Sequence, residues 1–211
     1  MSAAPSTLVV ATGNRGKIRE LISLLGDLPL NVVSVADVLG QKPAVAEDED
    51  TFAQNACKKA VAIGSAVGML TLADDSGLEV DALGGRPGVR SARFAGENAS
   101  DEQNNAALLA ALAGFSGDKR RARYRCALAL FDPRRDGVPI IVEGVCEGFI
   151  AHAPRGNGGF GYDPLFFVEG EGKTMAELDL VQKNRISHRA HAVTALRPRL
   201  ELLLGATLLP S

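Results

Sequence analysis

Features that would assign this chain of 211 residues to a membrane-bound, secreted or disulfide-rich class are missing. No apolar run approaches the ~18 residues that mark a membrane span. The N-terminus lacks the basic region and apolar core of a secretory signal. The three cysteines, Cys57, Cys126 and Cys146, lie far apart and form no Cys-x-x-Cys pair. We therefore expect a cytoplasmic protein whose cysteines are buried free thiols.

The sequence also contains no internal repeat, low-complexity tract or linker that would mark a domain boundary. Apolar residues make up 46% of the chain and charged residues 23%, the usual proportions of a globular protein. A net charge of -2 argues against a protein that coats nucleic acid. We expect one domain over residues 1–211.

The stretch 70–81 places two adjacent acids at the end of an apolar strand. Ser76 and Gly77 are predicted to turn the chain directly after these acids. Successive side chains of a strand point to opposite faces, so only one of Asp74 and Asp75 can face a given site. One acid would then act chemically while the other supports it. An ordinary Asp-Ser-Gly turn is the alternative that these residues leave open.

Near the N-terminus, a short apolar strand over residues 8–11 is followed by a polar loop and then by apolar residues at helical spacing from Ile18. Thr12 or Asn14 is placed to cap this helix, and a helix N-terminus beside Lys17 attracts anions. The loop departs from the Walker pattern. It predicts either a phosphate site or an ordinary connection between strand and helix.

An acidic loop, residues 46–50, precedes a second predicted helix. Thr51 and Gln54 form a capping signal at the start of this helix, and Gly68 ends it. Acids ahead of a helix favour its dipole. A metal ligand among them is the second interpretation.

Two alternating runs, 121–131 and 139–150, predict a hairpin and hence a sheet that is at least partly antiparallel. One face of the first run carries three arginines: Arg121, Arg123 and Arg125. Such a stripe could bind a single nucleic-acid strand. Glu143 and Glu147 have the parity that places them on the same face, which favours a charge-neutralised ladder instead.

A glycine-rich segment, residues 156–164, can bring its backbone close to a ligand and carries Phe160 and Tyr162. His188 and Arg189 open the last predicted helix. Both can donate hydrogen bonds to one planar partner.

Taken in order, these motifs resemble those of the inosine triphosphate pyrophosphatase family, whose members hydrolyse ITP, dITP and XTP to monophosphate and pyrophosphate. The resemblance runs end to end. Its motifs are Thr12-Gly13-Asn14-Arg15-Gly16-Lys17, Asn55-Ala56 with Lys59-Ala60, Asp74-Asp75-Ser76-Gly77-Leu78, Phe160-Gly161-Tyr162-Asp163-Pro164 and Ile186-Ser187-His188-Arg189. The resemblance implies an elongated α/β fold of two lobes around a bent mixed β-sheet with a central substrate cleft, Mg²⁺ dependence and a homodimer.

The same resemblance implies the roles of individual residues. Asp75 would be the catalytic acid, and Asp75 and Glu47 would associate with the metal. The substrate-binding residues would be Thr12, Gly13, Asn14, Arg15, Gly16 and Lys17 at the phosphates, Ser76 beside the catalytic acid, and Phe160, Gly161, Tyr162, Asp163, Lys183, His188 and Arg189 at the base. Whether Asp75 ligates the metal or accepts a proton stays open. The family usually has Glu-Thr-Gly where this chain has Glu47 followed by two acids, so the choice of metal ligand among residues 47–50 also stays open.

Base selectivity follows from the donors that this assignment places in the site. Hypoxanthine and xanthine carry a carbonyl oxygen at C6, where adenine carries an amino group. Arg189, His188 and Lys183 would donate hydrogen bonds to this oxygen. The site would then bind the first two bases and reject adenine. Phe160 would stack on any purine and contribute affinity. We expect a purine nucleoside triphosphate as the ligand, with neither nucleic acid nor a membrane as a partner.

Overall fold

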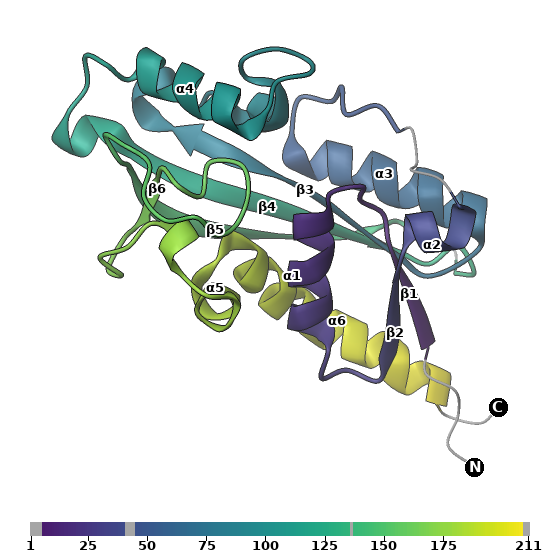
Figure 1. The fold of residues 1–211 in the computed structure, drawn as a ribbon. Helices are drawn as coiled ribbons and strands as arrows, with labels where there is room; N and C mark the ends of the chain where they lie inside the picture. Colours follow the sequence, from purple (N-terminus) through teal and green to yellow (C-terminus); the bar gives the residue numbers. More distant parts are fainter. Residues whose placement is uncertain (1–5, 41–44, 136, 209–211) are drawn as a thin grey trace. The chain divides into compact units, whose positions relative to one another are not determined.

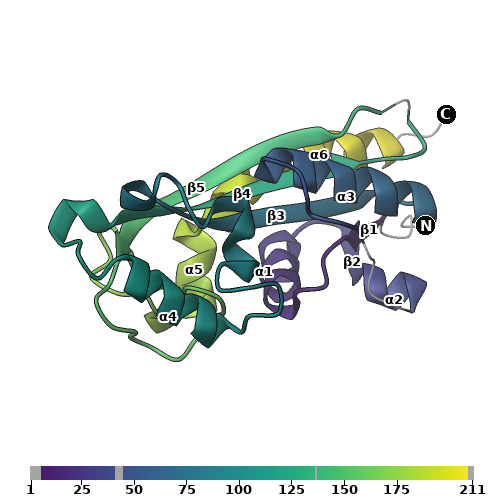
Figure 2. The same cartoon turned by 90° about the horizontal axis from the view of Figure 1, so that it is seen from above.

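The computed structural model describes residues 6–40, 45–135 and 137–208. Its one six-stranded sheet has the order β2-β1-β3-β4-β5-β6 (Figure 1; Figure 2 gives the view from above). The strands are β1 (Ser6–Val10), β2 (Leu30–Ser34), β3 (Thr71–Val80), β4 (Arg121–Phe131), β5 (Ile140–Ile150) and β6 (Phe166–Val168). Strand β1 pairs in parallel with β2 and β3, whereas β5 and β6 are antiparallel. The predicted α/β fold around a mixed sheet is confirmed.

The helices begin and end largely where capping residues predict. They are α1 (Arg15–Leu25), α2 (Val35–Leu39), α3 (Phe52–Val67), α4 (Asp101–Ala111), α5 (Leu180–Ile186) and α6 (His188–Leu208), with 3₁₀ turns η1 (Asp81–Leu83), η2 (Gly88–Arg93), η3 (Gly117–Arg120) and η4 (Met175–Glu177). Asn14 caps α1, Thr51 caps α3, and Gly68 ends α3 in the left-handed conformation. The short helix α2 was not predicted, although Ser34 and Asp37 form its capping box.

The chain divides into two compact units. Unit 1 comprises the described residues within 1–75, 127–144 and 189–211, and unit 2 comprises residues 76–126 and 145–188. Strands β3, β4 and β5 each contribute residues to both units. Unit 2 has a continuous apolar core that includes Leu78, Leu108, Tyr124, Tyr162 and Phe166.

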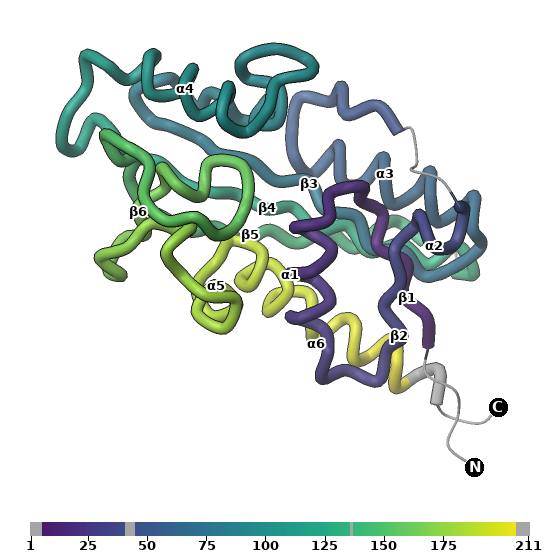
Figure 3. The backbone as a smooth tube through the Cα atoms, in the orientation of Figure 1, coloured from purple at the N-terminus to yellow at the C-terminus, as the bar shows by residue number. Residues whose placement is uncertain are grey.

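Strand β3 corrects one prediction. Ser76 and Gly77 do not turn the chain, because both lie inside β3, whose backbone is traced in Figure 3. The strand lies between β1 and β4, and residues 71–75 are all buried. A central, buried position favours extended pairing over the local turn preference of Asp-Ser-Gly. Asp74 and Asp75 therefore lie in the middle of a strand and not at its end.

The expectation of buried free thiols is confirmed for two of the three cysteines. The three cysteines are free, with Cys126 and Cys146 buried and Cys57 half-buried. Burial raises the pKa of the Cys146 thiol to about 12, so this thiol stays protonated at neutral pH. Within the described ranges, no helix is long and apolar enough to cross a membrane.

Candidate functional site

The two central acids of β3 are buried against different partners, and Asp74 is the more deeply enclosed. Its carboxylate is bound by Lys17 Nζ at 2.6 Å and by Arg189 Nε at 2.8 Å. Arg189, at the start of α6, also donates through Nη1 to Glu20 of α1. We refer to Lys17, Glu20, Asp74 and Arg189 as the Asp74 cluster; all four residues belong to unit 1. Two acids and two cations leave this cluster electrically neutral.

The charge of Asp74 is fixed by this cluster. Burial alone would raise the pKa of Asp74, but the charges of Arg189 and Lys17 outweigh burial and hold the pKa well below its usual value. Asp74 is therefore an anion throughout the physiological pH range. It connects α1 and α6 to β3, which is a supporting role.

Asp75 meets a different cation, Lys59 of α3. Lys59 Nζ lies 3.1 Å from Asp75 Oδ1, 2.6 Å from Glu47 Oε1 and 2.7 Å from the backbone oxygen of Asp74. Lys59 and Asp75 are both only 6% exposed. One ammonium group thus faces two carboxylates, which leaves a surplus of negative charge at this place.

The protonation of Asp75 also differs from that of Asp74. Burial raises the pKa of Asp75, and the nearby charges of Lys59 and Lys17 offset only part of this effect. Its Oδ2 atom is buried and has no hydrogen-bond partner among the described residues. A carboxylate with a raised pKa and an unused oxygen is suited to accept a proton or to bind a cation.

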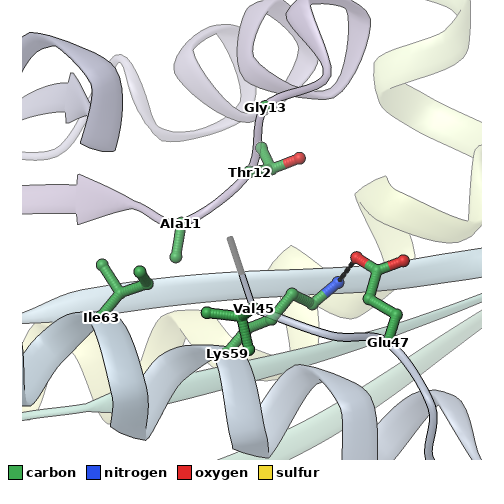
Figure 4. Close-up of a pocket in the computed structure, with 7 residues that line it drawn as sticks. All are labelled: Ala11, Thr12, Gly13, Val45, Glu47, Lys59 and Ile63. Carbon is green, nitrogen blue, oxygen red and sulfur yellow. Dashed lines mark hydrogen bonds and ion pairs between the residues drawn. The ribbon is translucent and has the colours of Figure 1, made fainter. Parts of the chain in front are cut away.

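A pocket of about 60 Å³ lies beside Lys59. It is lined by Ala11, Thr12, Gly13, Val45, Glu47, Lys59 and Ile63. Figure 4 shows the Lys59 amine meeting the Glu47 carboxylate, with the loop from Ala11 to Gly13 across the pocket. Such a volume has room for an ion and a few water molecules. Part of the predicted phosphate loop therefore lies close to one of the two candidate metal ligands.

The donor set suits Mg²⁺ better than a metal held by the protein alone. No group of three or more His, Cys, Asp or Glu residues that could hold a metal occurs in the part of the chain that the structure describes. Magnesium typically uses one or two carboxylates and takes its other ligands from water and substrate phosphates. Glu47 and Asp75, which share Lys59, provide two carboxylates, and Asp75 Oδ2 is an oxygen without a protein partner.

The structure separates Glu47 from other acids of its loop. Asp48 and Glu49 both pair with Lys58. The fully buried side chain of Asn55 accepts a hydrogen bond from the Glu49 amide at 3.1 Å and so fixes this part of the loop. Glu47 differs from Asp48 and Glu49 in sharing its lysine, Lys59, with Asp75.

The N-terminus of α1 is capped more fully than a bare anion site would be. Asn14 Oδ1 accepts hydrogen bonds from the amides of Gly16 at 2.8 Å and Lys17 at 3.1 Å. Thr12 Oγ1 in turn accepts from the Asn14 amide at 3.2 Å. The cap satisfies these amides, whereas Gly13 and Arg15 are exposed. A bound phosphate would meet the loop first at its exposed residues.

In unit 2, Asp163 organises the glycine-rich loop. Asp163 Oδ1 accepts from the Tyr124 hydroxyl at 3.1 Å, and Oδ2 accepts from Lys183 Nζ at 2.7 Å and from the Phe160 amide at 3.2 Å. Gly159 has a φ of +78°, and a Cβ there would lie 2.0 Å from the Asp163 carboxylate. Only glycine fits at this position. The predicted residues Phe160, Asp163 and Lys183 are therefore brought together.

Tyr124 adds His188 to this group. The two rings stack with their centroids 4.7 Å apart and an interplanar angle of 16°. Tyr124 thus holds two residues that the sequence assigned to the base, His188 and Asp163. Arg189 was assigned to the same group, but the structure engages its Nε and Nη1 with Asp74 and Glu20 instead.

Arginines on β4 are paired with acids, and strand parity predicted one of these partners, Glu147. The ion pairs are Arg123 with Glu147, Asp81 and Glu79, Arg125 with Glu79, and Arg121 with Glu169. All seven of these side chains are partly exposed, so each pair contributes little stability. A stripe that is paired with acids is a poor match for a nucleic-acid backbone.

Three contributors were given no role from the sequence: Glu20, Tyr124 and Lys59, although Lys59 belongs to one of the family motifs. Lys59 carried a signal, because it lies with Asn55 on the face of α3 that buries Ala56 and Ala60. A lysine at the spacing of an apolar stripe must meet a buried acid or water. Glu20 and Tyr124 carried no comparable signal, since their partners come from distant elements.

Comparison with known proteins gives consistent results. Residues 8–199 match the model of the Ham1 family. The dITP/XTP pyrophosphatase of Geobacter sulfurreducens is 51% identical over 92% of this chain and 96% of its own. That of Geobacillus kaustophilus is 50% identical over 94% of this chain and 96% of its own. The structure of a HAM1 protein from Coxiella burnetii superposes with a TM-score of 0.83 at 40% identity and covers 93% of this chain and 98% of its own.

The buried Asp74 cluster makes a prediction about stability. Arg189→Ala should lower the free energy of unfolding by about 3–5 kcal/mol, because it leaves the buried carboxylate of Asp74 with only one of its two cations. Arg197→Ala is the matched control on the same helix: Arg197 pairs with the exposed Asp27 at 2.8 Å, and its loss should cost about 1 kcal/mol or less. Urea unfolding followed by circular dichroism measures both. Equal losses would show that the Asp74 cluster does not support the fold.

Proposed function

Because the chain belongs to the Ham1 family, we propose that it hydrolyses dITP, ITP and XTP to the nucleoside monophosphate and pyrophosphate. The observation that carries the proposal is 51% identity to a dITP/XTP pyrophosphatase over 92% of the chain. Such a reaction needs carboxylates that can hold a cation or accept a proton, and Asp75 and Glu47 beside Lys59 would supply them. Removal of deaminated purine nucleotides from the nucleotide pool is the corresponding role.

The triphosphate is assigned to unit 1. A nucleoside triphosphate carries close to four negative charges, and the loop from Thr12 to Lys17 offers exposed backbone and the cation of Arg15. Lys17 is already bound to Asp74. Its ammonium group is therefore held in a fixed place, and contact with a phosphate would cost it little side-chain freedom.

Asp75 and Glu47 would hold Mg²⁺, which neutralises charge on the phosphates when bound. Lys59 lies between these carboxylates and keeps both in place through direct contacts. Glu47 is the more exposed partner, so it can change its contacts as substrate enters, whereas Asp75 is fixed in β3.

Proton transfer is assigned to Asp75. Water attacks the α-phosphorus, the bond to the leaving pyrophosphate breaks, and one proton is released. Oδ1 of Asp75 already accepts from Lys59, so Oδ2 is the atom that either takes this proton or meets the cation. The raised pKa of Asp75 brings it closer to that of an effective general base.

The base is assigned to unit 2. Phe160 offers an aromatic face for stacking, and Lys183 and His188 offer donors for the carbonyl oxygen at C6. Asp163 and Tyr124 hold these side chains in place. Discrimination against adenine then comes from donors that would face an amino group. The assignment of Arg189 to the base stays a prediction from the resemblance, because this side chain lies in unit 1 and binds Asp74 and Glu20.

The assignment of Asp75 is tested with Asp75→Asn. Turnover of ITP with Mg²⁺ should fall by roughly 10²–10⁴-fold, the usual contribution of general base catalysis. The melting temperature should not fall, because ionised Asp75 is buried at a cost that the amide avoids. Pyrophosphate release and thermal unfolding measure the two effects. Near-normal turnover in this variant would remove Asp75 from the reaction.

Base recognition is tested with Lys183→Ala. The kcat/KM for ITP should fall by roughly 10- to 100-fold, because a hydrogen bond to a charged group contributes about 1.5–3 kcal/mol. Activity on ATP should not rise, because truncation removes a donor without adding an acceptor. Lys173→Ala, at an exposed position of unit 2, is the control and should behave as wild type. Unchanged selectivity between ITP and ATP in Lys183→Ala would exclude Lys183 from base recognition.

We also propose a homodimer. Apolar side chains that remain exposed in unit 1 include Val38 at 38% and Leu39 at 39% on α2. Closed two-fold dimers are the commonest oligomers and cover such side chains. Sedimentation velocity at micromolar concentration should give twice the mass of one chain, whereas a monomer would contradict the proposal.

A further inference from the structure

The backbone of the glycine-rich loop is held from helix α4 by two side chains. Asp101 Oδ2 accepts a hydrogen bond from the Gly161 amide at 2.6 Å, and Asn105 Nδ2 donates one to the Gly161 carbonyl at 3.0 Å. Asp101 and Asn105 are four residues apart, so they lie on one face of α4. Both polar groups of a single residue, Gly161, are therefore fixed by one helix.

The helix is the rigid partner in this contact. Leu108 of α4 is fully buried in the core of unit 2. Asn104 fastens α4 on another side, where it accepts from the Ala95 amide at 2.9 Å and donates to the Ala92 carbonyl at 3.1 Å. The helix therefore fixes the position of the loop, and not the reverse.

The loop needs such a support. Residues 156–161 include four glycines, and Gly156, Gly159 and Gly161 have φ values of +78°, +78° and +61°. A glycine-rich segment samples many conformations before it is fixed. Phe160 directly precedes Gly161, the residue that α4 holds. The orientation of its half-buried ring therefore depends on the backbone of Gly161.

The side chain of Asn105 is suited to this contact and to little else in the described residues. Its orientation is defined, because the Gly161 carbonyl can only accept and must therefore meet the amide nitrogen. Its Oδ1 atom is buried with no partner among the described residues. Asparagine also disfavours a helix interior relative to alanine, by up to ~0.7 kcal/mol. The contact with Gly161 offsets these two costs.

We propose that Asp101 and Asn105 are positioning residues for purine recognition, because they fix the Gly161 peptide and thereby the Phe160 ring that stacks on the base. This inference rests on the proposed function. A support that only pre-arranges the base site strengthens ground-state and transition-state binding equally. Loss of the support therefore raises KM and leaves kcat unchanged.

The test compares Asp101→Ala, Asn105→Ala and Glu102→Ala in the full chain, with ITP and Mg²⁺. The first two should raise KM by roughly 2- to 12-fold, the equivalent of about 0.5–1.5 kcal/mol for one newly mobile side chain, with kcat within about twofold of wild type. Glu102 is the matched control, because it is an exposed acid in the same first turn of α4. Glu102→Ala should leave KM unchanged. A general effect on the stability of α4 would instead change KM in both Asp101→Ala and Glu102→Ala.

Two further variants separate positioning from simple loss of structure. Asp101→Asn keeps an oxygen acceptor for the Gly161 amide and should restore a KM near that of wild type. In a Phe160→Ala background, Asp101→Ala should add no further change in KM, because its effect passes through the Phe160 ring. Melting temperatures confirm that each variant is folded.

The outcomes distinguish this inference from the proposed function. A wild-type chain that does not hydrolyse ITP, dITP or XTP overturns both. An active wild type in which Asp101→Ala matches Glu102→Ala, or lowers kcat instead of raising KM, overturns the positioning role alone. Additive effects of Asp101→Ala and Phe160→Ala on KM do the same. If Asp101→Ala does not fold, Asn105→Ala decides by the same criteria.

Discussion

The burial of two adjacent carboxylates in the middle of β3 is the constraint on which the rest of unit 1 depends. An unpaired carboxylate in the interior is too costly to persist as an anion, so each acid requires a cation from another element. Asp74 obtains Lys17 from α1 and Arg189 from α6, whereas Asp75 obtains Lys59 from α3. Three helices are thereby fixed around one short segment of strand.

The two acids receive different degrees of compensation, and this difference divides their roles. Asp74 faces two cations, keeps a depressed pKa and joins the fold together. Asp75 shares one cation with Glu47, keeps a raised pKa and has an oxygen without a partner in the described residues. The alternation of side chains along a strand makes this division possible, since neighbouring residues meet different surroundings. Structural support and reactivity can therefore occupy consecutive positions.

Features that depend on nearby residues could be predicted from the sequence. The caps at Asn14 and Thr51 and the ladder partner Glu147 followed from local hydrogen bonding and strand parity. The turn at residues 76–77 was wrong because burial on both sides of β3 outweighs local preference. The roles of Glu20 and Tyr124 could not be predicted, because each depends on which distant elements pack together. Recognition of the family motifs supplied the candidate site residues that composition and periodicity could not.

We propose that water attacks the α-phosphorus beside Asp75 and releases intact pyrophosphate. Hydrolysis of dITP in water enriched in oxygen-18, with the products separated and weighed by mass spectrometry, tests where the attack occurs. We expect the label in the nucleoside monophosphate and none in the pyrophosphate. Label in the pyrophosphate, or in free phosphate, would place the attack at another phosphorus and overturn the proposed reaction.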